Sequence, residues 1–342
     1  MKLNNGVVIE NHGKPYFIAE LNTSHFGNVD TAKKMIDAVK QANCDCAKFQ
    51  SWSADTLYSQ TYYRKNPIAK RFVTRFSFSP EQLKVLSDYA RSVGIDFAST
   101  PYSREEVDFL IHQCGVPFIK IASMEINNYP YLDYIARTGS AIILSTGMAD
   151  QEEITRAIQC IRDAGNDNIC VLHCVSIYPA QPSTINLNNI LAMRGLYPEL
   201  SIGYSDHTTG IETPIAAVAL GAPVIEKHFT LDSSKIGMDN QMAMEPQAFG
   251  AMVQSCRVAW ESLGKHNRVV SDAELAQRIN MRRSIVSKRP IVAGSVIAAE
   301  DLDFKRPGDG YSPTQIGSVL GKMAVQDISC DEVIYPHMMR AD

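Results

Sequence analysis

The sequence contains no long hydrophobic run and no secretory leader. No stretch of about 18 consecutive apolar residues, the least that a membrane-spanning helix requires, occurs in it. The opening segment, MKLNNGVVIENHGKP, lacks the apolar core of a signal peptide. We therefore expect a cytoplasmic protein without a membrane partner.

The chain also has no excess of positive charge. Lys and Arg together number 33 against 37 for Asp and Glu, and the formal net charge is −4. No global positive field is available to hold a phosphate backbone. We therefore expect no nucleic acid partner.

Several motifs of nucleotide and metal sites are absent. The sequence has no GxGxxG after a strand and no GxxxxGK[ST], so nucleotide binding loses its main support. It has no CxxC and no HExxH, which argues against a closed zinc site. The eight cysteines lie mostly in apolar runs, where a free cysteine behaves as a small hydrophobe, and we interpret them as reduced structural thiols.

The composition is that of a globular protein. The chain has 342 residues, 45% hydrophobic and 20% charged. At roughly 100 to 200 residues per domain, this length allows two or three domains, or one large barrel with an appendage.

Short apolar or β-branched runs alternate with amphipathic segments between residues 16 and 230. The runs predict eight strands, over 16–19, 46–49, 95–98, 118–121, 141–144, 169–172, 200–203 and 224–227. Apolar residues three or four apart predict helices over 31–42, 80–92, 104–113 and 151–164. The pattern is an α/β fold built from repeated strand–helix units.

Eight such units match a (β/α)8 TIM barrel, whose usual size is about 250 residues. A doubly wound open sheet is the alternative that periodicity alone leaves open. The count of eight favours the barrel, as do the polar residues after nearly every strand. Barrel enzymes keep their chemistry at the carboxyl ends of the strands.

Two regions depart from the repeat. Residues 51–79 are too many for a simple loop, so we expect them to fold over the barrel mouth. A polar linker over 265–283 separates the barrel domain, 1–264, from a stretch rich in short strands and Gly/Pro turns, 284–342. We predict that this stretch is a small separate β-rich domain.

Lys48 and Lys120 lie within apolar strand sequence. A charged amine is costly to bury without an anionic partner, which here is either a structural carboxylate or a ligand. Two such lysines at one barrel mouth favour a small, highly charged anion. Strand-end hydroxyls of Thr100, Ser123 and Ser145, together with Ser205, could complete a phosphate or carboxylate cradle.

His207 and His228 follow the seventh and eighth predicted strands, so both imidazoles should lie on one side of the mouth. Each alone would be expected as a hydrogen-bonded core residue. Two on neighbouring strands, with waters or carboxylate oxygens, suit an exchangeable divalent ion such as Mn²⁺, Co²⁺ or Mg²⁺.

In these motifs the sequence resembles the sialic acid synthase family, whose members condense phosphoenolpyruvate to make nonulosonic acids. The family includes legionaminic and pseudaminic acid synthases. The resemblance spans nearly the whole chain. It is carried in family order by IAELNTSH, AKFQ, STPYS, KIASMEINNYP, ILSTGM, LHCVSIYP, IGYSDHT, VIEKHFTLD and KRPGDGYS.

The resemblance implies a TIM barrel followed by a C-terminal antifreeze-like (SAF) domain, and a domain-swapped homodimer in which that domain covers the partner's site. It implies metal ligands at His207 and His228 and sugar contacts at Glu20, Gln50, Tyr178 and Asp239. The implied phosphoenolpyruvate cradle is Lys48, Thr100, Lys120, Ser123, Ser145, Ser176 and Ser205. Arg306 would reach in from the other subunit, toward the sugar's N-acyl group.

The chain departs from the family pattern at three places. Ser24-His25-Phe26-Gly27 stands where many relatives have Asn-His-Asn-Gly or similar, and Ser176 stands where Asn is common. Lys235 to Asp239 replaces a Pro-Gly-Pro-Asp-like turn, although the aspartate is kept.

The expected activity is the condensation of phosphoenolpyruvate with an open-chain N-acyl amino sugar, with release of phosphate. The sugar would be N-acetylmannosamine or a 2,4-diacetamido-2,4,6-trideoxyhexose. One alternative is a phosphoenolpyruvate-condensing synthase for a phosphorylated aldose, for which Arg64, Arg71 and Arg75 are the only evident phosphate contacts. A non-catalytic sugar-binding protein would leave the lysines and histidines without a role.

Overall fold

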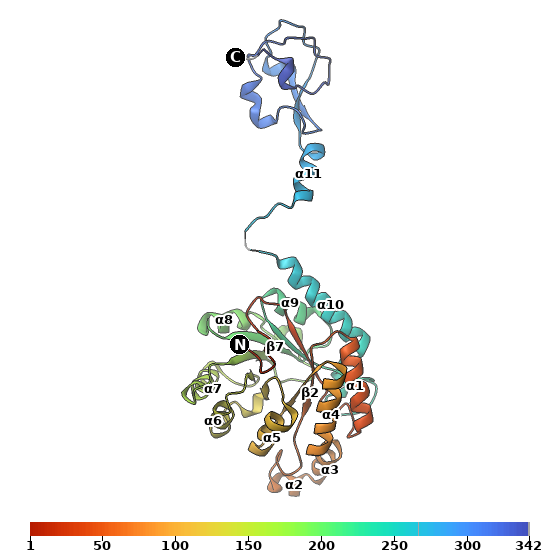
Figure 1. Cartoon of the computed structure of the whole chain (residues 1–342), viewed down its shortest axis with the longest axis vertical. Helices are drawn as coiled ribbons and strands as arrows, with labels where there is room; N and C mark the ends of the chain where they lie inside the picture. The colour runs from red at the N-terminus through yellow and green to blue at the C-terminus, as the bar shows by residue number, and fades with distance from the viewer. Residues whose placement is uncertain (266, 341–342) are drawn as a thin grey trace. The chain divides into compact units, whose positions relative to one another are not determined.

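The computed structural model describes residues 1–265 and 267–340 and divides the chain into two compact units, Met1–Gly264 and Lys265–Asp342 (Figure 1). None of the helices in these described ranges is long and apolar enough to cross a membrane.

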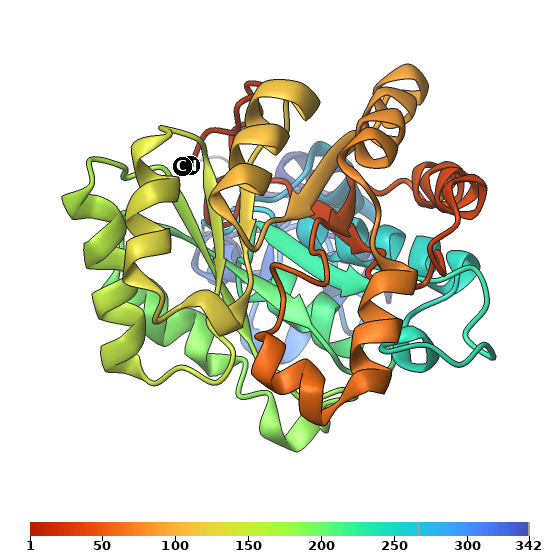
Figure 2. The same cartoon turned by 90° about the horizontal axis from the view of Figure 1, so that it is seen from below.

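The first unit is a parallel eight-stranded sheet curled into a ring and surrounded by helices (Figure 2). Its strands are β1 (Tyr16–Glu20), β2 (Cys46–Gln50), β3 (Asp96–Thr100), β4 (Ile119–Ile121), β5 (Ile142–Ser145), β6 (Ile169–Cys174), β7 (Ser201–Asp206) and β8 (Val224–His228). Hydrogen bonds join them in the order β3-β2-β1-β8-β7-β6-β5-β4, and β3 and β4 approach with Cα atoms within 8 Å. The predicted TIM barrel is therefore confirmed.

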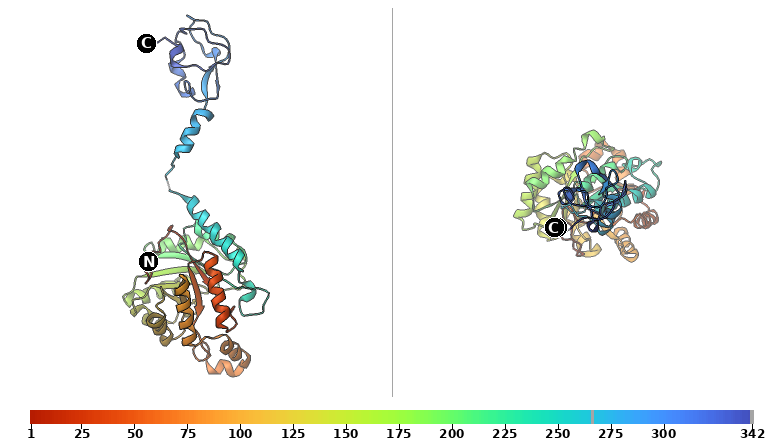
Figure 3. Two further views of the ribbon diagram at one scale, coloured as in Figure 1. Left: turned by 45° about the vertical axis from the view of Figure 1, so that its right-hand side comes forward. Right: turned by 90° about the horizontal axis from the view of Figure 1, so that it is seen from above.

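The helices of the first unit lie mostly outside this ring. They are α1 (Val29–Gln41), α2 (Gln60–Lys65), α3 (Pro67–Phe76), α4 (Pro80–Val93), α5 (Arg104–Phe109), α6 (Tyr129–Arg137), α7 (Gln151–Asp163), α8 (Asn188–Leu196), α9 (Glu212–Ala219) and α10 (Pro246–Leu263). The predicted helices correspond to α1, α4, α5 and α7, with α5 continued by a π-helical turn. Figure 3 shows α1 beside α10.

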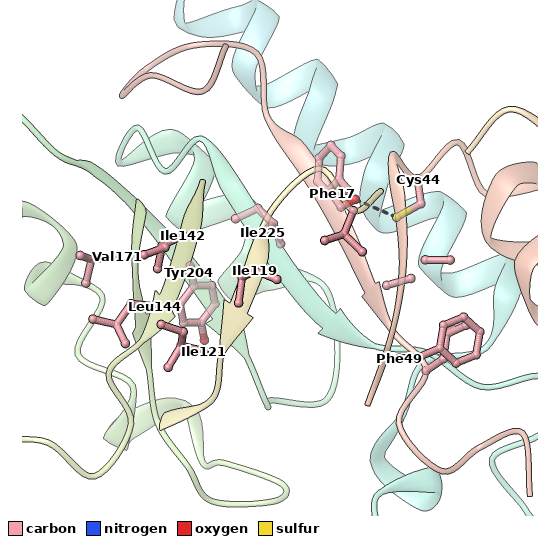
Figure 4. Close-up of a cluster of buried hydrophobic side chains, with 14 of the residues drawn as sticks. Phe17, Cys44, Phe49, Ile119, Ile121, Ile142, Leu144, Val171, Tyr204 and Ile225 are labelled. Atoms are coloured by element: carbon pink, nitrogen blue, oxygen red, sulfur yellow. Dashed lines mark hydrogen bonds between the residues drawn. The ribbon is translucent and has the colours of Figure 1, made fainter. Parts of the chain in front are cut away.

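Alternation along the strands separates two apolar layers. Phe17, Ile142 and Tyr204 belong to the cluster that packs between the strands and the helices (Figure 4). Ile18 and Ile143, one residue further along their strands, belong to a second cluster. Because successive strand residues face opposite sides, this second cluster fills the barrel interior.

The amino-terminal segment closes the bottom of the barrel. Lys2 bridges to Val8, and the buried side chains of Leu3 and Ile9 join the interior cluster. The Asn4 amide donates to the Val116 carbonyl at 3.1 Å. The barrel is therefore packed below, and its polar strand ends lie above.

The segment between β2 and α4 forms helices α2 and α3, which the sequence did not predict. Trp52, Leu57 and Tyr58 of this segment line the cavity at the mouth, as expected for a segment that folds over it. Tyr58 and Tyr62 stack with ring centroids 4.5 Å apart.

The second unit has its own core and little regular structure. It contains α11 (Asp272–Met281), which lies within the stretch predicted as a linker, and an antiparallel pair formed by β9 (Ser284–Ser287) and β10 (Leu302–Lys305). Isolated bridges and short 3-10 turns make up much of the rest. The buried residues of this core include Ile285, Val319 and Ile334.

Candidate active site

A cavity of about 320 Å³ opens at the carboxyl ends of the strands. Every site residue that the sequence predicted within the first unit lines it. These residues are Glu20, Lys48, Gln50, Thr100, Lys120, Ser123, Ser145, Ser176, Tyr178, Ser205, His207, His228 and Asp239.

Two buried lysines and two buried glutamates form the floor of this cavity. Lys48 and Lys120 are 2% and 3% exposed. Lys48 forms an ion pair with Glu20 and lies 3.5 Å from Glu226 Oε2, while Lys120 Nζ lies 3.6 Å from Glu226 Oε1. Both lysines thus have structural carboxylates beside them, the alternative that the sequence left open.

The charged groups in this cluster shift the pKa values of one another. Burial alone would raise the pKa of Glu226, but the ammonium groups of Lys120 and Lys48 and a hydrogen bond from Ser205 outweigh it and hold that pKa at about 2. Burial lowers the pKa of Lys120, although Glu226 opposes the shift. Glu226 is therefore a carboxylate at neutral pH, and it partly neutralises the lysines.

Hydroxyl groups surround the lysines on neighbouring strands. Lys48 Nζ donates to Thr100 Oγ1 at 3.1 Å, and Lys120 Nζ donates to Ser145 Oγ at 2.7 Å. Ser205 Oγ donates to Glu226 Oε1 at 2.9 Å. An anion that enters here would find ammonium and hydroxyl donors on several sides.

Gly147 leaves room for two further hydroxyls. Its backbone N–H donates to Ser123 Oγ at 2.9 Å. A Cβ at this position would collide with the side-chain oxygens of Ser123 and Ser176. A glycine is needed here because the backbone approaches both side chains so closely.

The two predicted metal ligands lie beside each other on one side of the mouth, at the ends of the paired strands β7 and β8. The ring centroids of His207 and His228 are 5.4 Å apart, and the Tyr178 ring lies 4.2 Å from that of His207. His207 Nδ1 lies 2.7 Å from the Val175 carbonyl, which can only accept, so Nδ1 carries a proton, and Nε2 presents its lone pair when the ring is neutral. Burial alone would lower the pKa of His207, but Cys174 and the Val175 carbonyl outweigh it and raise that pKa. Burial and the neighbouring His207 lower the pKa of His228, which keeps that imidazole neutral.

These imidazoles fit a divalent ion only in part. A nitrogen–metal bond is about 2.1 Å long, so rings at this separation are close enough to share one ion. Within residues 1–265 and 267–340, however, no group of three or more His, Cys, Asp or Glu side chains is arranged to hold a metal. Waters or substrate oxygens would have to supply the remaining ligands.

Polar groups outside the lysine cluster form the rest of the lining, which we call the polar wall. Gln50 Oε1 accepts a hydrogen bond from the Tyr102 hydroxyl at 2.8 Å. Asp239 accepts one from the amide of Asn22, whose backbone N–H donates to Glu20 Oε1 at 2.7 Å. Burial raises the pKa of Asp239. This wall suits a neutral ligand with several hydroxyls.

The lining also includes residues that were not predicted for the site, among them Glu226, Asn22, Tyr102 and Cys174. Glu226 carried the same signal as the lysines, a charge inside the apolar strand VIEKH. Cys174 corrects the interpretation of the cysteines as purely structural. All eight are free, but Cys174 lines the cavity and Cys330 is exposed.

Arg306 lies in the second unit, where its side chain is exposed and Nη1 contacts Met281 Sδ at 3.8 Å. Its predicted role at the cavity of a partner subunit stays a prediction.

The model of the NeuB family matches residues 35–268, most of the barrel unit and its site. The chain belongs to the NeuB family. The SAF domain model matches residues 282–340 of this NeuB protein, which confirms the expected second domain.

Named relatives extend along nearly the whole chain. The N,N'-diacetyllegionaminic acid synthase of Legionella pneumophila is 39% identical over 92% of this NeuB chain and 91% of its own. The N-acetylneuraminate-9-phosphate synthase of Mus musculus is 34% identical over 93% and 91%. The crystal structure of an N-acetylneuraminic acid synthetase from Leptospira borgpetersenii aligns with a TM-score of 0.74 at 31% identity, covering 81% of this chain and 94% of that one. The resemblance to sialic and legionaminic acid synthases is confirmed.

Proposed function

We propose that this protein condenses phosphoenolpyruvate with the aldehyde of an open-chain N-acyl amino sugar and releases inorganic phosphate. The observation that carries the proposal is the division of one cavity into two walls. One wall has two buried ammonium groups among hydroxyls, and the other has neutral and acidic hydrogen-bonding groups. The names of the relatives support the same class of product.

The reaction begins when C3 of phosphoenolpyruvate attacks the aldehyde carbon, whose oxygen takes up a proton to become a hydroxyl, and the new C–C bond leaves a cation at C2. Water adds to C2 and loses a proton. The resulting tetrahedral phosphate ester then collapses with cleavage of the C2–O bond, giving the keto acid and inorganic phosphate.

Lys48 and Lys120 would hold the phosphate and carboxylate through both steps. To do so they must exchange part of their contact with Glu20 and Glu226 for the incoming anion. Holding two reactants in the correct orientation is worth about 7 to 11 kcal/mol in favourable systems. Glu20, Gln50, Tyr178 and Asp239 would contact the sugar, and Glu20 would exchange a proton with a sugar hydroxyl.

His207 and His228 would hold a divalent cation, which we propose to be Mn²⁺, with Mg²⁺ and Co²⁺ as alternatives. When bound there, such an ion supplies Lewis-acid polarisation of the aldehyde oxygen. The neutral imidazole of His228 supports this assignment. The Val175 carbonyl engages Nδ1 of His207, which leaves Nε2 of the neutral ring free to bind the ion.

We further propose a homodimer in which the SAF domain of one subunit completes the site of the other through Arg306. Its guanidinium, exposed in the second unit, would recognise the sugar's N-acyl group.

The test is phosphate release from phosphoenolpyruvate with Mn²⁺ and a panel of sugars. The panel contains N-acetylmannosamine, its 6-phosphate and 2,4-diacetamido-2,4,6-trideoxyhexoses. Release that depends on one of the unphosphorylated sugars supports the proposal. Release with the phosphorylated sugar alone would favour the alternative of a synthase for a phosphorylated aldose, consistent with the 9-phosphate in the name of the mouse relative. Release with none would refute both.

A further inference from the structure

Asn22 occupies an unusual position at the end of β1. Its φ of 37° lies in the left-handed region that favours glycine, its side chain is 4% exposed, and it lines the cavity. Asparagine tolerates this backbone conformation better than most residues, but the conformation is still uncommon and is concentrated at functional sites.

The backbone N–H and the side-chain nitrogen of Asn22 both have hydrogen-bond partners. Its backbone N–H donates to Glu20 Oε1, and Nδ2 donates to Asp239. A carboxylate oxygen can only accept, so the amide nitrogen must face Asp239. The amide oxygen, Oδ1, is thereby directed elsewhere.

Oδ1 of Asn22 is buried and has no hydrogen-bond partner. Among the described residues, the only other buried side-chain atom without a partner that belongs to the cavity lining is Glu226 Oε2. That atom lies 3.5 Å from the Lys48 ammonium, which relieves it electrostatically. Asn22 Oδ1 has no such neighbour among the described ion pairs and hydrogen bonds, so it needs a donor from outside the chain.

The loop that carries Asp239 is otherwise held by its own side chains. The Asn240 amide donates to the carbonyls of Asp232 and Lys235 at 2.8 and 2.7 Å, and Thr230 Oγ1 donates to Asn240 Oδ1 at 2.5 Å. The Asn22–Asp239 bond connects this loop to β1. A ligand that meets Asn22 therefore meets a group fixed both to β1 and to this loop.

We propose that Asn22 is a specificity-determining residue whose Oδ1 accepts a hydrogen bond from a hydroxyl or amide N–H of the sugar. This inference rests on the proposed function, because it assigns the sugar to the wall that contains Asp239. The phosphoenolpyruvate wall contains no part of Asn22.

Asn22→Gly tests the inference because glycine accepts the same backbone conformation without loss. The KM for the sugar should rise about tenfold or more, the usual scale for a buried donor that loses its acceptor, while the KM for phosphoenolpyruvate stays within about twofold. The matched control is Asn43→Gly at an exposed asparagine with φ 57°. It should change neither constant. An unchanged sugar KM in Asn22→Gly would overturn the inference.

Asn22→Asp provides a second variant if the glycine variant does not fold. It retains the shape and the acceptor but sets a carboxylate against Asp239. The sugar KM should therefore rise further than in Asn22→Gly at neutral pH and fall again toward acid pH, where one of the two carboxylates is protonated. No recovery toward acid pH would count against the proposed bond.

Calorimetric binding of the sugars separates this inference from the proposed function. If the unaltered protein binds N-acetylmannosamine or a diacetamido sugar but releases no phosphate, the proposed reaction fails. The inference then stands only if Asn22→Gly weakens that binding about tenfold. Deoxy analogues, tested one position at a time, should reveal one analogue that both proteins bind equally. If none of the sugars binds the unaltered protein, both proposals are refuted.

Discussion

At the residue scale, Lys120 contacts neighbouring side chains and also borders the space proposed for phosphoenolpyruvate. Its ammonium lies among Glu226, Ser145 and the space proposed for an anion. Lys120→Met removes one charge-assisted contact, worth about 1.5 to 3 kcal/mol. We expect the KM for phosphoenolpyruvate to rise at least about tenfold while the KM for the sugar changes little.

The fold should tolerate this change because Glu226 keeps the Lys48 ammonium at 3.5 Å as a counter-charge and because burial already disfavours the charge on Lys120. Lys84→Met, on the exposed face of α4, serves as the control. Equal losses for both substrates in Lys120→Met would contradict the assignment of the lysine wall.

His207 provides the test of the metal site. His207→Ala removes one of the two imidazoles, so the affinity for Mn²⁺, measured directly by titration, should fall by orders of magnitude. Chelation should abolish turnover in the unaltered protein, and added Mn²⁺ should restore it. His337→Ala, at an exposed histidine of the second unit, should bind the ion normally. Full activity of metal-free protein in chelator would disprove the site.

His25 turned out to be part of the core, not of the cavity. Its ring stacks on Phe78 with centroids 4.1 Å apart, and its Nδ1 accepts from the backbone N–H of Gly27 at 3.0 Å. Burial lowers the pKa of His25 to about 3, so the folded protein keeps it neutral. His25, which the family pattern keeps between the changed Ser24 and Phe26, therefore contributes to packing and not to the cavity lining.

This histidine should make stability depend on pH. The unfolded chain takes up a proton near pH 6.5, whereas the folded protein does so only near pH 3. The contribution of His25 is thus fully present above pH 6.5 and is lost as the pH falls through that window, by about 1.4 kcal/mol per pH unit.

His25→Phe should flatten the pH dependence of the free energy of unfolding by that slope, measured by urea titration between pH 4 and 7. The variant will be less stable at pH 7 because the Gly27 N–H loses its acceptor. His112→Gln, at an exposed histidine, should keep the slope of the unaltered protein. An unchanged slope in His25→Phe would show that the histidine is not neutral in the folded state.

At the element scale, a buried ion pair holds the carboxyl ends of β7 and β8 together. Asp206 and Lys227 are register partners that form an ion pair, and Asp206 Oδ1 also accepts from Tyr204 and from the Thr208 backbone at 2.8 and 2.9 Å. Each immediately precedes a proposed metal ligand. Because strand residues alternate, the pair faces outward while the histidines face the cavity.

Asp206→Asn should destabilise the protein by about 3 to 5 kcal/mol, since it leaves a buried ammonium without its counter-charge. Urea unfolding measures the effect. Asp133→Asn, which breaks an exposed pair with Arg137, should leave the unfolding midpoint unchanged. A loss in Asp206→Asn no larger than in this control would mean that water reaches Lys227.

The strands and their polar ends were predictable because period-two patterning and charges in apolar runs are local signals. Helices α2 and α3 were not predicted. Helix α3 carried a local signal that was given no weight, because Phe72, Val73 and Phe76 recur at helical spacing. Helix α2 is only six residues long, and its start depends on Ser59 capping the Tyr62 N–H. Asn22 could not be found from sequence, since its role arises from a backbone angle and from Asp239, which is distant along the chain. Glu226, in contrast, could have been predicted, because its charge inside an apolar strand was visible in the sequence but was not assigned to the site.

At the scale of the whole molecule, the barrel unit contains its complete core and its cavity. A chain ending at Gly264 should therefore fold and bind phosphoenolpyruvate, measured by calorimetry, yet lose turnover if Arg306 is needed.

Mixing two impaired variants, Lys120→Met and Arg306→Ala, at a phosphoenolpyruvate concentration too low for the Lys120→Met site to turn over, tests whether that need is met by the partner subunit. In a domain-swapped dimer, half of the randomly paired dimers contain both variants, and one of their two sites has both residues intact. Activity should return to about a quarter of the unaltered value. No recovery after verified subunit exchange would mean that Arg306 acts within its own chain or not at all.

The pairing of β1 with β8 also constrains the order of events when the chain is made. Tyr16 pairs with Val224, so the two strands that close the ring are separated by about 200 residues. At a synthesis rate of about 5 to 20 residues per second, β8 leaves the ribosome roughly 10 to 40 s after β1. Until then β1 has an unpaired edge, and contacts over so large a separation form slowly. Nascent chains should therefore depend on chaperones during this interval, although the finished barrel does not.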